Sequence, residues 1–443
     1  MNKEILRPSG LTKLIAYLKQ RIFINAGYIF SVNILPGLIG VVFWAVAGRF
    51  YLPSDIGLSV AILSAISLLS VISTLGMNIG VIRFLPQADN QALFLNAIYT
   101  FVAIVALITS GIYILGIPFW GENIAAGLRR PDQITLLIVF VIIRTVGNVV
   151  QNTFIALRES GFALQYTGLV QFLRIAILAT GIWLGADASL LVGSHLVSYL
   201  IGLLVCFFVL IPNLVTSFRA KPILYISMIM DLLPYAAGNQ LAVIFQQIQQ
   251  LLFPLIILEF LGSDANGYAY MALMLGAVIT SPAFALINSA FAEGANMRRM
   301  GKQILLRTSK QAILLSAIIS LLVLLLSPYL LSIFGYQYVE SSSLLLRFLA
   351  LAAPSITLNQ AYFTQLSLLK QTTRLVWLNV ILAVLSVGLC LLTIKSMGIL
   401  GCGIAVLVAN LVLNLMIVYL FRRESGSSES GEGMDGRIDI FSG

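Results

Sequence analysis

Long apolar runs divided by short polar connections occupy almost the whole chain. Runs of about 18 residues or more, at about 1.5 Å per residue, can cross a hydrocarbon core of about 30 Å as helices. The chain has twelve such runs, joined by short connections, which predicts twelve spanning helices. One of the longest interruptions, at residues 212–234, divides them into two sets of six. The first set is expected at residues 22–48, 56–80, 92–116, 133–157, 162–184 and 189–211. The second set is expected at residues 235–260, 265–292, 310–334, 341–368, 374–396 and 398–421.

Composition supports this interpretation and excludes a soluble domain. The chain of 443 residues is 59% hydrophobic and 10% charged, and its mean hydropathy is +1.00. A membrane barrel would instead show shorter segments that alternate between apolar and polar residues. The net charge of +9 does not indicate nucleic-acid binding, because the basic residues lie between apolar runs rather than in one patch. We therefore predict an all-α polytopic membrane protein.

The two halves resemble each other. Leu52-Pro-Ser-Asp55 joins the first two spans, and Leu261-Gly-Ser-Asp264 joins the seventh and eighth, at an offset of 209 residues. Two sets of six helices that enter the membrane from the same side form a parallel repeat, related by an axis along the membrane normal. We expect an N-lobe at 22–211, a linker at 212–234 and a C-lobe at 235–421.

The distribution of Lys and Arg predicts the orientation. If the N-terminus is cytoplasmic, the connections on the outer side hold only Arg49, Arg129, Arg130 and Lys395, and all other connecting basic residues are inside. Both termini are then cytoplasmic. Residues 1–21 carry an apolar stripe beside basic residues, which predicts an amphipathic helix on the cytoplasmic surface. Residues 422–443 are rich in Ser, Gly and acids, which predicts a disordered tail.

The fourth predicted span contains an arginine near the bilayer midplane. Arg144 shares one helical face with Asn148, Gln151 and Asn152, at i, i+4, i+7 and i+8. A guanidinium at this depth costs about 2.5–3.5 kcal/mol on insertion scales, so it must face a wet or polar interior. A cationic stripe at mid-depth favours binding of an anionic group there.

Two further arginines lie within spans. Arg174 is as deep as Arg144 and shares a face with Gln171. The structural alternative for both is a partner inside the bundle, but no Asp or Glu lies at a similar depth in the sequence, so that partner would be a carbonyl or an amide. Arg347 lies nearer the outer end of span ten, with Asn359 on about the same face, and snorkelling to the interface is an equal alternative. Arginine forms bidentate bonds with phosphate, so an anionic headgroup is the expected ligand.

The seventh predicted span carries an unusual density of amides. Amides act both as donors and as acceptors, so they suit sugar hydroxyls. The alternative is hydrogen bonding between helices, worth about 0.6 kcal/mol each in membranes. The candidate sugar-binding residues, including those on spans four, five and ten, are Asn148, Gln151, Gln171, Asn239, Gln246, Gln247, Gln250 and Asn359.

Other polar residues are weaker candidates. Arg49 and Arg83 close the first two spans and could contact either lipid headgroups or substrate. His195, the only histidine, is expected to be a packed polar residue rather than a proton carrier. The three cysteines all lie in apolar runs, which gives no sign of an extracellular disulfide framework. No catalytic constellation or metal-ligand cluster stands out in the sequence, so we expect a transporter without a cofactor rather than an enzyme.

Several stretches resemble a known family. They are residues 44–57, with Arg49 and the turn Asp55-Ile-Gly57, residues 75–86 around Arg83, and residues 331–340 and 345–351. Together they resemble the O-antigen and capsule repeat-unit flippases of the multidrug/oligosaccharidyl-lipid/polysaccharide (MOP) exporter superfamily. The resemblance implies two six-helix lobes in a MATE-like arrangement around a cationic cavity that opens to each side in turn. No buried carboxylate for ion coupling is apparent, which leaves the driving force open.

The resemblance also implies a substrate and a location. The substrate would be an oligosaccharide on a polyprenyl pyrophosphate, moved across the cytoplasmic membrane for surface polysaccharide biosynthesis, beside polysaccharide assembly proteins. Arg144, Arg174 and Arg347, with Arg49 and Arg83, are then the candidate pyrophosphate ligands, assigned from their depth and position. The alternatives are a drug exporter of the same superfamily, for which buried acids would be expected, and a membrane glycan polymerase or ligase, for which a larger outer loop would be expected.

Overall fold

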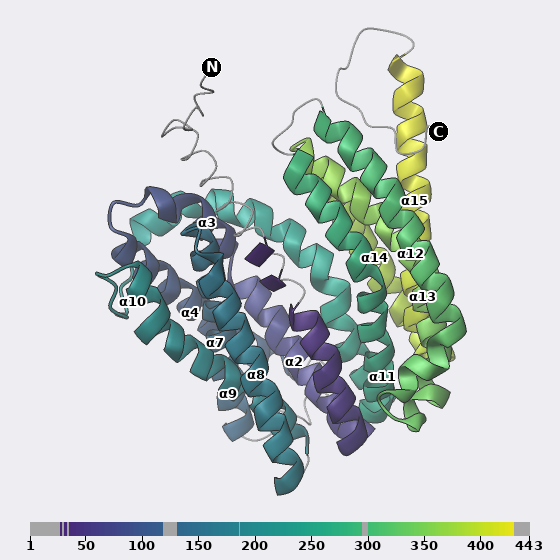
Figure 1. Cartoon of the computed structure of the whole chain (residues 1–443), viewed down its shortest axis with the longest axis horizontal. Coiled ribbons are helices and arrows are strands. Elements are labelled where there is room, and N and C mark those ends of the chain that lie inside the picture. Colours follow the sequence, from purple (N-terminus) through teal and green to yellow (C-terminus); the bar gives the residue numbers. More distant parts are fainter. Residues whose placement is uncertain are drawn as a thin grey trace, which may run out of the picture.

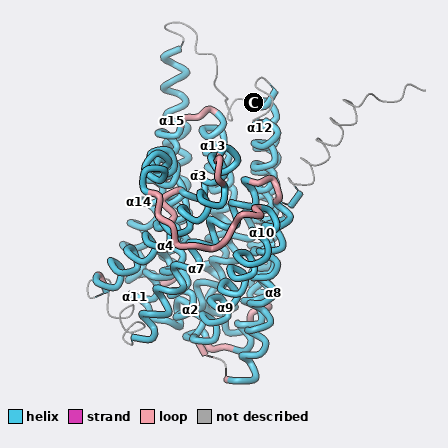
Figure 2. The backbone as a smooth tube through the Cα atoms, turned by 90° about the vertical axis from the view of Figure 1, so that its left-hand side faces the viewer, coloured by secondary structure: helices cyan, strands magenta, loops and turns pink. Residues whose placement is uncertain are grey.

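The computed structural model describes residues 27–28, 31–32, 35–117, 131–185, 187–294 and 300–428. The described chain consists of helices and short connections (Figures 1 and 2). An apolar helix at Leu35–Phe50 is followed by the labelled elements. These are α2 (Pro53–Ser73), α3 (Met77–Phe84), η1 (Leu85–Gln87), α4 (Gln91–Leu115), α7 (Pro131–Ala156), α8 (Ser160–Leu184), α9 (Ala188–Val205), η2 (Cys206–Leu210), α10 (Ile211–Leu214), α11 (Ile226–Gly294), α12 (Met300–Ser332), α13 (Tyr336–Leu368), α14 (Thr372–Met397) and α15 (Leu400–Ser428).

Ten of the described helices are long and apolar enough to cross a membrane. One of them, α11, holds two of the predicted spans, because its 69 residues bend at Gly262, where φ is 85°. A positive φ is strained for other residues, so glycine permits this reversal. The shorter helix Leu35–Phe50 covers the described part of the first predicted span. The prediction of an all-α polytopic membrane protein is therefore confirmed.

Local sequence explains several helix boundaries. α2 begins with Pro53, whose fixed φ suits the first helical position. The Asn90 side chain accepts a hydrogen bond from the Leu93 N–H at 2.9 Å and caps α4. In the same way Asp187 accepts from the Leu190 N–H at 3.0 Å and caps α9. Asp187 thus has a capping role at the start of α9.

The two halves lie on opposite sides of the molecule. Figure 1 shows α3–α10 on one side and α12–α15 on the other, with α11 between them. α11 packs against α2 of the first half and against α12, α13 and α14 of the second. It begins at Ile226, inside the segment predicted as a linker, and α15 continues to Ser428, inside the segment predicted as a tail. The predicted amphipathic helix at 1–21 lies outside the described residues.

The repeated turns meet at the junction of the halves. The Asn266 amide Nδ2 donates to the Gly57 carbonyl at 2.6 Å, and these two residues are 209 positions apart, the offset of the sequence repeat. A Cβ on Gly57 would lie 1.8 Å from the Ser263 carbonyl oxygen, and one on Gly267 would lie 2.1 Å from the Pro53 carbonyl oxygen. The backbones touch only because both positions are glycine. We call this contact the repeat junction.

Candidate functional site

Arg174 on α8 is placed among aromatic side chains. Its guanidinium carbon lies 4.7 Å from the centroid of the Phe43 ring, and its Nη1 lies 3.4 Å from Nε2 of His195 on α9. His195 is 5% exposed, and its Nδ1 donates to the Leu191 carbonyl at 2.9 Å. With Nδ1 protonated, Nε2 of a neutral ring is the acceptor that faces Arg174.

The remaining donors of Arg174 have no acceptor in the part of the chain that the structure describes. Its Nε and Nη2 are buried and make no hydrogen bond among the described residues. Most buried polar atoms in proteins are hydrogen-bonded, and donors on a charged group are the most costly to leave unpaired. A guanidinium with two inward-facing free donors is complementary to an anionic oxygen acceptor.

Arg144 on α7 belongs to the same cluster. It is half-buried, and its guanidinium carbon lies 5.3 Å from the centroid of the Tyr199 ring on α9. His195, which faces Arg174, and Tyr199, which faces Arg144, lie one turn apart on α9, so the same face of α9 holds both guanidinium groups. We call Arg144, Arg174, His195, Tyr199 and Phe43 the arginine–aromatic site. Aromatic faces offset part of the cost of holding guanidinium groups away from water.

The predicted amides beside this site are mostly joined to neighbouring helices. Asn148 Nδ2 donates to the Ser70 hydroxyl of α2 at 3.1 Å, and Gln151 Nε2 donates to the Thr167 hydroxyl of α8 at 3.1 Å. Gln171 is buried, and its Oε1 has no partner among the described residues. Asn148 is one turn from Arg144 and Gln171 is one turn from Arg174, whereas Gln151 is two turns from Arg144, and the amide donors of Asn148 and Gln151 already bind protein.

The amides of the seventh predicted span lie on α11, away from that cluster. Gln246 and Gln250 are exposed and Gln247 is half-buried, and Gln246 Nε2 lies 3.3 Å from Gln360 Oε1 of α13. The Asn239 side chain lies outside the described residues. Gln240, a neighbour in the same run, is buried and donates to the Val71 carbonyl. That bond joins α2 to α11. At Gln240 the amide therefore makes a hydrogen bond between helices, which is the alternative to sugar binding given above.

The other predicted arginines lie apart from the arginine–aromatic site. Arg49 is exposed, and its Nε donates at 3.0 Å to the carbonyl of Ile333, so it joins the halves beside the repeat junction. The exposed Arg83 has its guanidinium carbon 4.2 Å from the Tyr235 ring centroid. Arg347 is exposed and its Nε donates to the Ser327 hydroxyl at 3.1 Å.

Asn359, predicted to lie on the face of Arg347, is buried instead. Its Nδ2 donates at 2.9 Å to Oδ1 of Asn410 on α15. One helical turn earlier, the Ser355 hydroxyl accepts from Asn414 Nδ2. These four residues form a polar contact between α13 and α15, which we call the amide cluster.

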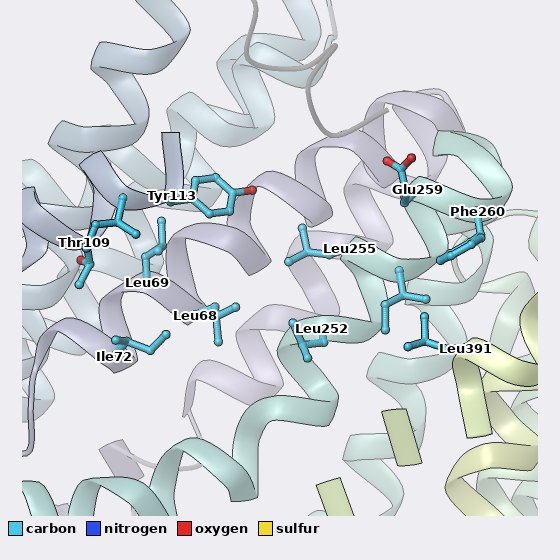
Figure 3. Close-up of a pocket in the computed structure, with 12 residues that line it drawn as sticks. Leu68, Leu69, Ile72, Thr109, Tyr113, Leu252, Leu255, Glu259, Phe260 and Leu391 are labelled. Atoms are coloured by element: carbon cyan, nitrogen blue, oxygen red, sulfur yellow. The ribbon is translucent and has the colours of Figure 1, made fainter. Parts of the chain in front are cut away.

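An apolar cavity of about 530 Å³ lies between the halves (Figure 3). Figure 3 shows Leu68 facing Leu252 and Leu255 across it, with Glu259 and Phe260 at one end. Carbon atoms dominate its walls, so it suits hydrocarbon and not phosphate or sugar. It is lined by Leu68, Leu69, Ile72, Thr109, Ile112, Tyr113, Leu252, Leu255, Ile256, Glu259, Phe260 and Leu391.

The aromatic residues of the arginine–aromatic site, Phe43 and Tyr199, were not predicted from the sequence as site residues. Phe43 and Trp44 lie in the first predicted span, where they are indistinguishable from core residues. The Trp44 ring contacts Tyr270 of α11, with centroids 4.9 Å apart, which connects this wall to the second half. The spacing of His195 and Tyr199, i and i+4, is the one sequence signal that could have drawn attention to α9.

Comparison with known proteins identifies the fold. No family model and no curated protein matches the sequence. An inward-closed structure of the lipid II flippase MurJ matches with a TM-score of 0.72 and 13% identity, over 89% of this chain and 87% of that one. An inward-facing MATE multidrug resistance transporter of the MOP superfamily matches with a TM-score of 0.66 and 16% identity, over 89% and 96%.

A third structure adds a description of charge. It is a MOP superfamily transporter from Pyrococcus furiosus, in which reverse polarity of the binding pocket suggests a different function. Its TM-score is 0.56 and its identity 17%, over 93% of this chain and 96% of that one. The chain therefore has the fold of MOP superfamily transporters. The identities are too low to carry more than the fold.

Proposed function

We propose that the chain is a flippase that moves a polyprenyl-pyrophosphate-linked oligosaccharide across the cytoplasmic membrane for surface polysaccharide biosynthesis. The observation that carries the proposal is Arg174, a deep guanidinium whose Nε and Nη2 are buried without an acceptor among the described residues. Arg144 adds a second positive charge on the same face of α9. Phosphate oxygens supply the negative charge that this arrangement lacks, and they supply acceptors for the Nε and Nη2 donors of Arg174.

Alternating access is the proposed mechanism. With the cytoplasmic termini that the charge pattern predicts, the repeat junction closes the outer side of the molecule. The pyrophosphate binds Arg144 and Arg174 from the cytoplasmic side, and separation of Gly57 from Asn266 then opens the outer side. The hydrocarbon tail stays in the lipid, and the mainly apolar cavity along α2, with Glu259 at one end, gives it a hydrocarbon surface to lie against.

The fold of MurJ and MATE transporters supports transport in general. Lipid II, the cargo of the MurJ flippase, is also a lipid-linked substrate. A drug exporter is the second candidate, because MATE structures have the same fold. Two guanidinium groups repel organic cations, which is why we favour the anionic substrate.

Replacement of the two arginines tests the proposal. In cells without their own repeat-unit flippase, Arg174→Ala and Arg144→Ala should each reduce surface polysaccharide and the lipid-linked intermediate at the outer face. A lost hydrogen bond to a charged group is worth about 1.5–3 kcal/mol, which is about ten- to hundredfold. Lys at either position should restore part of the activity, because it keeps the charge but not the bidentate geometry.

The control is Lys310→Ala, which removes an exposed positive charge on α12 and should leave transport unchanged. Normal translocation by a well-expressed Arg144→Ala/Arg174→Ala double variant would disprove the proposed role. Export of organic cations by the wild-type protein, with no effect on polysaccharide, would favour the drug exporter instead.

A further inference from the structure

Two of the three cysteines meet in the second half. The Sγ atoms of Cys390 on α14 and Cys402 on α15 lie 2.8 Å apart, and both side chains are 0% exposed. The structure describes both as free thiols. A disulfide needs two cysteines whose backbones come within about 7 Å and whose side chains point at each other. This pair has its sulfur atoms in contact without any movement of the helices.

Local packing brings the pair together. α14 ends at Met397, Gly398 turns the chain with φ of 60°, and α15 begins at Leu400. A Cβ on Gly401 would lie 2.9 and 3.0 Å from the backbone carbon and oxygen of Thr393. The missing side chain lets the start of α15 lie directly against the end of α14. The next residue, Cys402, then packs against Cys390.

We propose that Cys390 and Cys402 form a disulfide at the outer end of the α14–α15 hairpin. The proposal rests on the orientation that the charge pattern predicts, which places the 398–399 turn outside, and not on the nature of the transported substrate. Disulfides persist in oxidising compartments such as the outer side of a cytoplasmic membrane, and they are rare on the cytoplasmic side. The bond joins the two helices at the end where only a short turn connects them.

The oxidation has a defined balance. Two thiols lose two protons and two electrons, and the acceptor is the disulfide of a thiol-oxidising protein, which becomes a dithiol. One cysteine thiolate attacks that disulfide and forms a mixed disulfide, which the second cysteine then resolves. Because neither sulfur is exposed in the folded chain, the exchange takes place before α15 packs against α14.

The third cysteine provides an internal control. Cys206 is also buried, but it belongs to the core of the first half, which also contains Tyr99, Phe154 and Phe218. Cys390 and Cys402 belong to the core that joins the halves. Cys206 should therefore remain a thiol while the other two are oxidised, and the chain holds three cysteines in all.

Counting thiols tests the proposal. Cells are lysed directly into acid to stop exchange, and the full-length protein is then denatured and alkylated with a maleimide reagent that changes its gel mobility. Without reductant one thiol should react, and after reduction three should react. Because the protein is denatured for the measurement, correct folding of a variant is not required for a clear result.

Variants identify the pair. Cys402→Ser should show two reactive thiols with or without reductant, because Cys390 and Cys206 are then both free. Cys206→Ser should show none before reduction and two after it. Three reactive thiols in the unreduced wild-type protein would overturn the proposal, as would a Cys402→Ser variant that still shows a single one. Neither result would bear on pyrophosphate binding by Arg144 and Arg174.

Discussion

The arginine–aromatic site and the amide cluster both lie within a bundle of apolar helices, but they differ in what they leave unsatisfied. In the first, the donors Nε and Nη2 of Arg174 lack an acceptor among the described residues. In the second, Asn359 and Asn414 place their donors on Asn410 and Ser355, and it is their Oδ1 atoms that lack a partner among those residues. A carbonyl oxygen with a free lone pair costs less than an unpaired donor on a charged group.

This difference indicates what each half contributes. A site that holds buried charged donors without a partner among the described residues is complementary to an anion, which is why we propose the first half as the binding place of the pyrophosphate. In the amide cluster, the side-chain donors of Asn359 and Asn414 already have acceptors on the neighbouring helix. These hydrogen bonds therefore fix the packing of α13 against α15. Buried polar residues that look similar in sequence thus have different roles in the two halves. Three substitutions test this assignment.

The largest expected effect lies between the two regions, at the repeat junction. Gly57→Ala places a Cβ 1.8 Å from the Ser263 carbonyl oxygen, so the halves must separate at this point. Overpacking of this kind costs about 1–3 kcal/mol, which shifts the balance between the closed and open arrangements by about five- to hundredfold. We expect transport to fall by a similar factor. Labelling of a cysteine introduced at Ser263 by an impermeant maleimide should rise.

Gly111→Ala on α4 is the matched control, because a Cβ there meets nothing within 4 Å. It should transport and label like the parent protein. If Gly57→Ala also did so, the halves would not move about this contact, and the arginine–aromatic site would need another route to the outer side.

A smaller effect is expected at His195, which orients Arg174. His195→Leu removes the acceptor at 3.4 Å from Nη1. Because this bond is long, we expect it to be worth about 0.5–1.5 kcal/mol, less than a short bond to a charged group, or about two- to tenfold. In proteoliposomes, the substrate concentration for half-maximal transport should rise by this factor while the maximal rate changes little. His195→Gln keeps an acceptor and should recover part of the loss. An equal loss in both variants would mean that His195 serves packing against Phe43 rather than the position of Arg174.

The membrane-spanning helices could be predicted from the sequence, because apolar length is read directly along the chain. The repeated turns near Asp55 and Asp264 are also recognisable in the sequence. Their contact with each other is not. Contacts across helices could not be read in the same way. Whether Gln240 faces a cavity or the Val71 carbonyl depends on the angle at which α2 crosses α11. The periodicity of residues within one helix gives no information about that crossing angle.

The contacts of the aromatic residues could not be predicted from the sequence either. In a soluble protein Phe43 would be assigned to the core, and in an apolar run it is one ring among many. Its contact with Arg174 exists only once the first helix packs against α8. The bend at Gly262 was predicted as a loop between two spans, and the structure shows it as a single residue that leaves the helix on both sides intact.

The smallest expected effect separates structure from transport in the amide cluster. Asn359→Leu leaves Asn410 Oδ1 without its donor, and hydrogen bonds of this type in membrane proteins are worth about 0.6 kcal/mol on average and about 1.7 at most. Thermal unfolding in detergent should shift slightly downward, and transport should stay within about twofold of the parent. Asn359→Leu/Asn410→Leu should recover part of the lost stability, since replacing both partners by apolar groups can be nearly neutral. A loss of transport in Asn359→Leu as large as that in Arg174→Ala, with unchanged thermal stability, would show that the second half also binds the substrate.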